Sequence, residues 1–382
     1  MQEMIYLDNA ATTWPKPPSV LRRVNRCFKE ACGNPGRSAH LLSMRAAEEV
    51  YHARCALNRF FGGNAEQNVI FFPNATASLN TVIRGVLSAG DHVITTNIEH
   101  NSVLRPLYAL RRDGVTYDIV DVVGATDSQI IERIFARIRR NTRLVIVNHV
   151  SNVTGRVMPL QLIAALCCQR GILFCVDASQ SAGVYPLDMK NDGFDYLCCA
   201  GHKSLFGIQG SGLAVIRDGA PIPRPLMQGG NGVRSLELQM PSGLPEMLEA
   251  GTVNVPAIVS LHAGVSYIER HGRERLYSEI QHLSAPILSD FRELEREGQL
   301  RLFLDGTQGG SVISFAVRGQ SPAQTAEALE AYGICVRSGF HCAPLIHQAL
   351  GCEDGGTVRL SFSAMNTMHD VEVFLTALHA IL

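Results

Sequence analysis

Lys203 lies between a short apolar run and a glycine-rich stretch, a setting in which a lysine can do chemistry. The run Tyr196–Cys199 comes first, and the glycines Gly207, Gly210 and Gly212 follow shortly after. A lysine at the end of a strand, next to a phosphate pocket, can form a Schiff base with pyridoxal phosphate (PLP). An ordinary surface lysine is the alternative, so this interpretation depends on whether the chain holds the other parts of a PLP site.

Asp177 ends the apolar run Ile172–Val176. A carboxylate at that point can pair with a protonated pyridine nitrogen and keep the PLP ring an electron sink. A turn or N-cap aspartate is the ordinary alternative. Gln180, three residues further on, could donate a hydrogen bond to the phenolic oxygen of the ring. The spacing between Asp177 and Lys203 leaves room for a connection and another strand, so neighbouring strands can present both.

A phosphate group has a candidate binding segment in Asn74-Ala75-Thr76, which follows the run Val69–Phe72 and opens a helical pattern. Free amides at a helix N-terminus bind phosphate, and Thr76 adds a hydroxyl group. His202 offers a second donor. A nucleotide-binding phosphate loop is excluded, because its motif needs glycine directly before the lysine, where His202 stands.

Two further polar segments follow apolar runs. In Glu99-His100-Asn101-Ser102 the imidazole of His100 could stack on the ring, although a lone histidine is more often structural. The segment Asn148–Asn152 ends another run and offers Asn152 to the cofactor oxygen or to a substrate carboxylate.

Cys342 differs from the other cysteines in its setting, Arg337-Ser338-Gly339-Phe340-His341-Cys342-Ala343-Pro344. The proline predicts a short helix over Leu345–Leu350. A thiol near a helix N-terminus, with His341 and Arg337 close in sequence, is expected to favour the nucleophilic thiolate. In Thr357–Phe362, alternation places Arg359 on the face opposite Val358 and Leu360, where it could hold a carboxylate bidentately or simply face solvent.

The composition limits which kinds of protein this chain can be. The 382 residues are 46% hydrophobic with a formal net charge of -1, which predicts two domains and gives no electrostatic case for nucleic acid or an anionic membrane surface. The start of the chain does not read as a signal peptide, and no apolar run approaches the length of a membrane span, which predicts a soluble, cytoplasmic protein. Eleven cysteines without any Cys-x-x-Cys pair indicate reduced thiols rather than a metal site.

Apolar runs alternate with helical patterns over the first two thirds of the chain, which predicts an α/β domain with a mostly parallel sheet. Candidate strands are Asn68–Phe72, His92–Thr95, Arg143–Asn148, Leu173–Asp177, Tyr196–Cys199 and Ser211–Ile216. Candidate helices are Ser43–Phe60, Ala75–Ser88, Ser102–Asp113, Ser128–Arg139 and Leu160–Arg170. Ligands bind at the carboxyl edge of such sheets, where many of the polar residues above fall.

The pattern changes after about residue 255. A helical stretch over Ala257–Arg296 leads into candidate strands at Val312–Val317, Ile334–Arg337 and Val358–Phe362, which predicts a smaller α+β domain. We expect residues 15–255 to form the large domain, and residues 256–382 with the segment 1–14 to form the small one. Leu226–Glu249 reads as a connecting loop beside the cleft.

Taken together, these residues resemble class V aminotransferases of the fold-type I PLP superfamily, and specifically cysteine desulfurases of the SUF type (group II). The resemblance covers nearly the whole chain, from Tyr6-Leu7-Asp8-Asn9-Ala10-Ala11-Thr12-Thr13 through Gly201-His202-Lys203 and Glu249-Ala250-Gly251-Thr252 to Arg359-Leu360-Ser361. Its most specific part is the short Arg-x-Gly-x-x-Cys motif ending at Cys342. The family's fold implies a seven-stranded, mostly parallel sheet in the large domain.

The resemblance also implies roles for the residues. Lys203 would carry PLP, with His100 on the ring, Asp177 on the pyridine nitrogen and Gln180 on the phenolic oxygen. The phosphate would be bound by Ala75, Thr76 and His202, and by Thr252 of a second subunit in a homodimer. Asn152 and Arg359 would hold the substrate carboxylate. Two positions depart from the family: Ala200 replaces a phosphate-binding Ser or Thr, and Ser179 replaces a small apolar residue.

The implied reaction is conversion of L-cysteine to L-alanine, with a persulfide left on Cys342 for a sulfur acceptor. Selenocysteine lyase, another C–S lyase or an epimerase on the same scaffold is the alternative enzyme, and a PLP-free regulatory protein is an alternative of another class. The acceptor stays open between iron–sulfur cluster assembly, tRNA thiolation and other pathways.

Overall fold

The large sheet is the central element of the fold. The computed structural model describes residues 4–36, 38–306 and 310–382. The sheet has seven strands in the order β2-β8-β7-β6-β5-β3-β4, of which only β8 runs antiparallel to its neighbours. Their bounds are β2 Val69–Phe72, β3 His92–Thr96, β4 Thr116–Val120, β5 Thr142–Asn148, β6 Leu173–Asp177, β7 Tyr196–Ala200 and β8 Gly212–Ile216. The predicted mostly parallel seven-stranded sheet is confirmed, and β4 is the strand that has no predicted counterpart.

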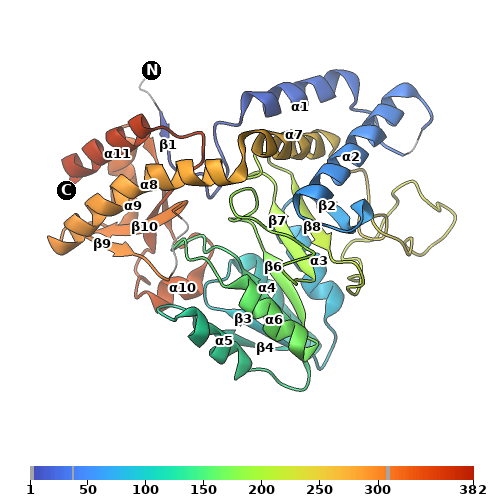
Figure 1. The fold of residues 1–382 in the computed structure, drawn as a ribbon, viewed down its shortest axis with the longest axis horizontal. Coiled ribbons are helices and arrows are strands. Elements are labelled where there is room, and N and C mark those ends of the chain that lie inside the picture. The colour runs from blue at the N-terminus through green and yellow to red at the C-terminus, as the bar shows by residue number, and fades with distance from the viewer. Residues whose placement is uncertain (1–3, 37, 307–309) are drawn as a thin grey trace.

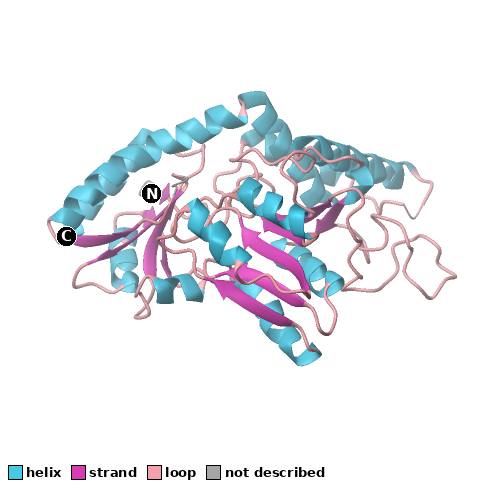
Figure 2. Cartoon of the chain, turned by 60° about the horizontal axis from the view of Figure 1, so that its bottom comes forward, coloured by secondary structure: helices cyan, strands magenta, loops and turns pink. Residues whose placement is uncertain are grey.

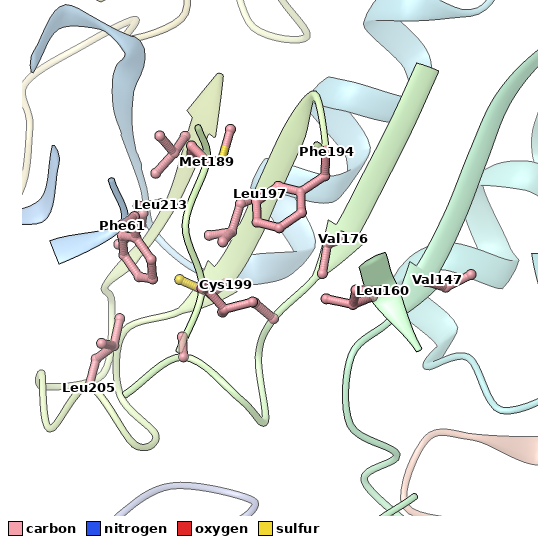
Figure 3. Packing of buried hydrophobic residues seen from close by; sticks show 14 of the residues in the cluster. Phe61, Val147, Leu160, Val176, Met189, Phe194, Leu197, Cys199, Leu205 and Leu213 are labelled. Atoms are coloured by element: carbon pink, nitrogen blue, oxygen red, sulfur yellow. The ribbon is translucent and has the colours of Figure 1, made fainter. Parts of the chain in front are cut away.

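Both faces of this sheet are apolar, because its strands carry hydrophobic residues at successive positions. Val147, Val176, Leu197 and Leu213 belong to the core on one face, which Figure 3 shows at close range. Residues one position away in each strand, Ile146, Cys175, Cys198 and Ala214, belong to the core on the other face. Helices therefore cover the sheet on both sides, as Figure 2 shows.

The helices that cover the sheet agree with the predicted ones to within a few residues. They are α2 Leu41–Phe60, α3 Ala75–Val86, α4 Asn101–Leu110, α5 Asp127–Phe135 and α6 Leu160–Arg170. The end of the predicted Ser102–Asp113 helix is the separate 3-10 turn η2 (Arg111–Asp113), and a second such turn, η1 (Glu66–Asn68), precedes β2. The helix α1 (Pro18–Glu30) has no predicted counterpart.

The predicted helical stretch Ala257–Arg296 consists of two helices, α7 (Val255–His271) and α8 (Arg273–Arg296). They are separated at Gly272, whose φ of 82° lies in the region that favours glycine. Apolar residues of α7 share the core of the large sheet, whereas α8 from Ile280 onwards packs in a second core.

A four-stranded antiparallel sheet, in the order β12-β13-β10-β9, forms the second core with α8 and two later helices (Figure 1). Its strands are β9 Leu300–Phe303, β10 Val312–Val317, β12 Arg337–Gly339 and β13 Thr357–Ser361, and its other helices are α9 Pro322–Glu330 and α11 Met368–Ile381. The predicted strand Ile334–Arg337 is divided between β12 and β11 (Ile334–Cys335), because β11 pairs with β1 (Ile5–Tyr6) instead. The short helix α10 (Pro344–Ala349) confirms the prediction made from Pro344.

The division into two domains stays a prediction. The pairing of β1 with β11 joins the N-terminal segment to the second core, although residues 1–3 of that segment lie outside the described residues. Leu226–Glu249 contains no helix or strand, in agreement with its interpretation as a loop. Within the described ranges, no helix has the length and hydropathy needed to cross a membrane.

Candidate active site

One cavity lies where β5, β6 and β7 end, and it brings together residues predicted from distant parts of the sequence. Neighbouring parallel strands place their carboxyl ends at one edge, and the N-termini of α3 and α4 meet them there. The predicted residues that line this cavity are Ala75, Thr76, His100, Asn152, Asp177, Gln180, His202, Lys203 and Arg359. Cys342 and Thr252 are not among its lining residues.

Asp177 is the last residue of β6, and its carboxylate is held in a fixed position. Its Oδ1 atom accepts hydrogen bonds from the backbone N–H of Ser179 (2.9 Å) and from the Ser179 hydroxyl (2.5 Å). Asp177 is only 5% exposed, so its carboxylate interacts with the protein groups around it rather than with solvent. Ser179, which departs from the family in type, thus contributes a hydroxyl that an apolar residue would lack. Gln180 donates from Nε2 to the carbonyl of Ala10 (3.1 Å).

Lys203 lies in the turn that follows β7. Burial of its amine lowers its pKa to about 8, an effect that the negative charge of Asp177 opposes and the positive charges of Arg359 and Arg337 reinforce. A larger fraction of this amine than of a solvated lysine is therefore neutral, and so nucleophilic, near neutral pH. The structure places Lys203 after β7 and in the cavity, and its role as the reactive lysine stays a prediction.

The N-terminus of α3 forms another wall of the cavity. Asn74 is its N-cap and accepts a hydrogen bond at Oδ1 from the N–H of Ala77 (2.9 Å), which fixes the first turn. Gly212 of β8 packs directly beneath, since a Cβ atom there would lie 2.5 Å from the Asn74 carbonyl carbon. His202 reaches the same cavity, and burial lowers its pKa to about 4, so it is a neutral donor.

His100 is the N-cap of α4, and its Nδ1 accepts a hydrogen bond from the N–H of Ser102 (3.0 Å). Burial lowers the pKa of His100 to about 4, with the positive charge of Lys203 adding to the effect. The preceding residue, Glu99, is fully buried, and this burial raises its pKa to about 8. Its Oε1 atom accepts hydrogen bonds from the Thr96 hydroxyl (2.5 Å) and from the Asn148 N–H (3.1 Å).

Arg359, on β13, is 1% exposed, which excludes the alternative of a solvent-facing arginine. One of its Nη atoms donates to Oδ1 of Asp8 (2.8 Å) and the other to the carbonyl of Asn152 (3.1 Å). Its Nε atom is buried and has no partner among the described residues. Asn152 donates from Nδ2 to the carbonyl of His341 (2.7 Å), so its side chain ties the two halves of the site together.

Cys342 is exposed at the rim of the cavity rather than inside it. Its Sγ atom lies 3.9 Å from a guanidinium nitrogen of Arg337, which itself lines the cavity. The carbonyl of Cys342 accepts a hydrogen bond from the N–H of Asn101 at the start of α4 (2.8 Å). His341 and Cys342 both have positive φ values, 49° and 58°, so this tight turn is held by its contacts.

Thr252 is exposed and lines a separate cavity between β2, α7 and the connecting loop. The structure therefore does not bring it to the other predicted residues within one chain. Nearby, Glu249 forms a buried bidentate pair with Arg54 of α2, at 2.9 Å for each contact. This pair fixes the segment that carries Thr252.

Several residues of the site were not predicted from sequence. Asp8 pairs with Arg359 across almost the whole length of the chain, a contact for which the local sequence has no signal. Glu99 is buried and accepts a hydrogen bond from Asn148, which lines the cavity, and its position beside His100 is the only local signal. The amine of Lys16 donates to the carbonyl of His202 (2.6 Å), and burial lowers its pKa to about 7.

Comparison with known proteins gives a consistent result. The sequence profile of the family "Aminotransferase class-V" matches residues 5–374. A probable cysteine desulfurase of Methanothermobacter thermautotrophicus is 32% identical over 382 residues, which cover 98% of this chain and 93% of that protein. A probable cysteine desulfurase of Pyrococcus abyssi is 32% identical, with 99% and 94% covered.

The same similarity is found among solved structures. The apo structure of a cysteine desulfurase from Thermococcus onnurineus superimposes with a TM-score of 0.90 at 31% identity, and the match covers 99% of this chain and 94% of that one. The fold, the full-length profile match and the relatives agree. The chain therefore belongs to the class-V aminotransferase family.

Proposed function

We propose that this protein is a PLP-dependent cysteine desulfurase, which converts L-cysteine to L-alanine and retains the sulfur as a persulfide on Cys342. The observation that carries the proposal is the single cavity in which Lys203, Asp177 and Arg359 meet, with Cys342 at its rim. The names of the relatives and of the structural neighbour support the same activity.

The residues of the cavity fit PLP in chemistry. The first turn of α3 offers free backbone amides for a phosphate, and His202 has a buried Nδ1 atom without a partner among the described residues. The carboxylate of Asp177 suits a pyridinium nitrogen, and the partly neutral amine of Lys203 suits an aldehyde carbon. When bound, PLP would supply an electron sink for charge that develops at the substrate Cα atom.

The substrate would be held and activated by side chains of this chain. Arg359 retains an unpartnered Nε–H for the α-carboxylate, because Asp8 and Asn152 leave that nitrogen free. The amine of Lys203, displaced from the cofactor by the substrate, would take the Cα proton as a general base. Its lowered pKa, about 8, matches that task near neutral pH.

The sulfur transfer step balances in atoms and electrons. The Cys342 thiolate attacks the substrate sulfur, so that an S–S bond forms and the C–S bond breaks. The electron pair of the broken bond stays with carbon, which takes up a proton to become the methyl group of alanine. The sulfur is correspondingly oxidised and remains on Cys342 as a persulfide.

Four finer proposals accompany this activity. The short Arg-x-Gly-x-x-Cys segment favours the SUF type (group II), and the position of Thr252, away from the cavity, is what a contribution to the partner of a homodimer requires. A protein sulfur acceptor, for example in iron–sulfur cluster assembly, would take the sulfur from the exposed thiol. All eleven cysteines, each within the described residues, are free, which favours a reducing, cytoplasmic setting.

The test is alanine and persulfide formation from L-cysteine, with wild type beside Cys342→Ala. We expect one alanine per sulfur from the wild type, and a loss of at least about 100-fold in the variant, which should still bind PLP. Cys168→Ala, which removes another exposed thiol, is the matched control and should retain the activity. Persulfide formation at the normal rate by Cys342→Ala would contradict the proposal, and activity on selenocysteine alone would favour a selenocysteine lyase.

A further inference from the structure

A third histidine of the cavity, next to Cys342, has no role in the mechanism above. His341 directly precedes Cys342, lines the cavity and is 3% exposed. Its Nδ1 atom is buried and has no hydrogen-bond partner among the described residues. Buried polar atoms are almost always paired, so an unpaired atom on a residue that lines a ligand cavity indicates a partner supplied by the ligand.

A chain of hydrogen bonds fixes the chemical state of this atom. His347 contacts the carbonyl of Ala343 through Nδ1 (2.8 Å), and because a carbonyl only accepts, Nδ1 carries the hydrogen. Burial lowers the pKa of His347, so the ring is neutral and its Nε2 atom is an acceptor. The hydroxyl of Thr357 lies 3.3 Å from that Nε2 and is its donor.

The hydroxyl group of Thr357 has only one hydrogen, and the hydrogen bond to His347 uses it. Its Oγ1 atom lies 3.0 Å from Nε2 of His341, so this second contact requires His341 to be the donor. Burial and the positive charges of Arg359 and Arg337 lower the pKa of His341 to about 2 and keep the ring neutral. With its hydrogen on Nε2, neutral His341 presents a bare lone pair on Nδ1.

Only one group of the proposed substrate can meet that lone pair. The α-carboxylate has no hydrogen to donate and belongs with Arg359, and the amino group is taken up by the cofactor. The thiol is the remaining donor, and it has to approach Cys342, the neighbour of His341 in the chain. We propose that Nδ1 of His341 accepts a hydrogen bond from the thiol of L-cysteine and so selects a thiol-bearing amino acid; this inference rests on the proposed function.

The test measures binding rather than turnover. In a Cys342→Ala background, which cannot accept sulfur, the dissociation constants of L-cysteine and L-alanine are measured from the absorbance of bound PLP. The two ligands differ by the thiol, so their ratio measures its contribution. We expect His341→Phe to lower the preference for cysteine about threefold to tenfold, while the affinity for L-alanine stays within about twofold.

Variants of Thr357 test the same chain of hydrogen bonds without altering His341. Thr357→Val removes the hydroxyl that fixes the ring, so the preference for cysteine should fall in the same direction, and Thr357→Ser should restore it. Equal weakening of both ligands in His341→Phe, or no preference for cysteine before mutation, would overturn the inference. Failure of the Cys342→Ala protein to bind either amino acid, despite bound PLP, would instead overturn the proposed function.

Discussion

The amine of Lys203 titrates in an accessible range because the fold removes it from water, and this allows a direct test. Only the neutral amine reacts with an aldehyde, and the pKa of Lys203 is lowered to about 8. We expect the rate of PLP capture by the apoprotein to rise with pH up to about 8 and then to level off. The measurement is the rate of borohydride-reducible PLP incorporation, from which the incorporation into Lys203→Ala at the other amines of the chain is subtracted. A midpoint near the pKa of a solvated lysine, about 10.4, would contradict this reading.

Glu99 makes stability depend on pH. Its pKa is raised to about 8 in the folded protein, above the value of about 4.3 of an unfolded chain, so the folded state holds the proton more tightly. The stability from this group is complete below about pH 4.3 and is lost as pH rises to about 8. We expect Glu99→Gln to remove on the order of 5 kcal/mol of this pH dependence, as measured by urea unfolding at several pH values. Glu132→Gln, on the exposed face of α5, should leave the slope unchanged; an equal slope in both variants would refute the assignment.

At the residue scale, the sequence predicts those site residues that follow an apolar strand. Asp177 ends such a strand and Lys203 lies in the turn after the next one, and neighbouring parallel strands bring these positions together. The partners of these residues could not be predicted in this way. The pair Asp8–Arg359 depends on the bridge between Asp8 and Ser361, and the contact of Thr357 with His341 depends on the pairing of β12 with β13. No local sequence pattern contains either pairing.

At the scale of elements, β8 and α3 form a close contact under the proposed phosphate site. A Cβ atom on Gly212 would lie 2.5–2.8 Å from backbone atoms of Asn74, so the first turn of α3 would have to move. We expect Gly212→Ala to weaken PLP binding at least about tenfold, since a displaced turn misaligns the amides. Equilibrium dialysis of PLP is the measurement, and Gly243→Ala, where a Cβ atom meets nothing within 4 Å, is the control. Unchanged PLP affinity in Gly212→Ala would show that α3 does not hold the phosphate.

The sequence analysis did not predict β4, α1 or the division of Ile334–Arg337, and each of these differences has a structural reason. β4 is an edge strand with Thr116 exposed and Asp118 half-buried, so it lacks the continuous apolar run that marks the central strands. α1 did carry a signal, because its buried residues Val20, Val24 and Cys27 recur at helical spacing. The division of Ile334–Arg337 between two sheets reflects pairing with β1, a contact between the two ends of the chain.

At the scale of the whole molecule, the connecting loop exposes two leucines that a homodimer would cover. Leu236 and Leu238 are fully exposed, and Thr252 lies further along the same connection. We expect a two-chain particle in light scattering, and we expect the double variant Leu236→Asp, Leu238→Asp to be monomeric with PLP affinity lowered about tenfold. Leu162→Asp, on the exposed side of α6, is the control and should remain dimeric. A monomeric wild type with full PLP affinity would exclude the role assigned to Thr252.

The hydrogen bond from the N–H of Asn101 to the carbonyl of Cys342 joins α4, beside the large sheet, to the turn that follows β12 of the small sheet. A second hydrogen bond joins the same two parts, because the side chain of Asn152 donates to the carbonyl of His341. Separation of the large sheet from the small one would have to break both hydrogen bonds. It would also move the N-terminus of α4, with His100, away from Cys342. The Cys342 thiol is exposed to solvent. If it carries the sulfur as proposed, an acceptor would reach it at the surface without breaking these two hydrogen bonds.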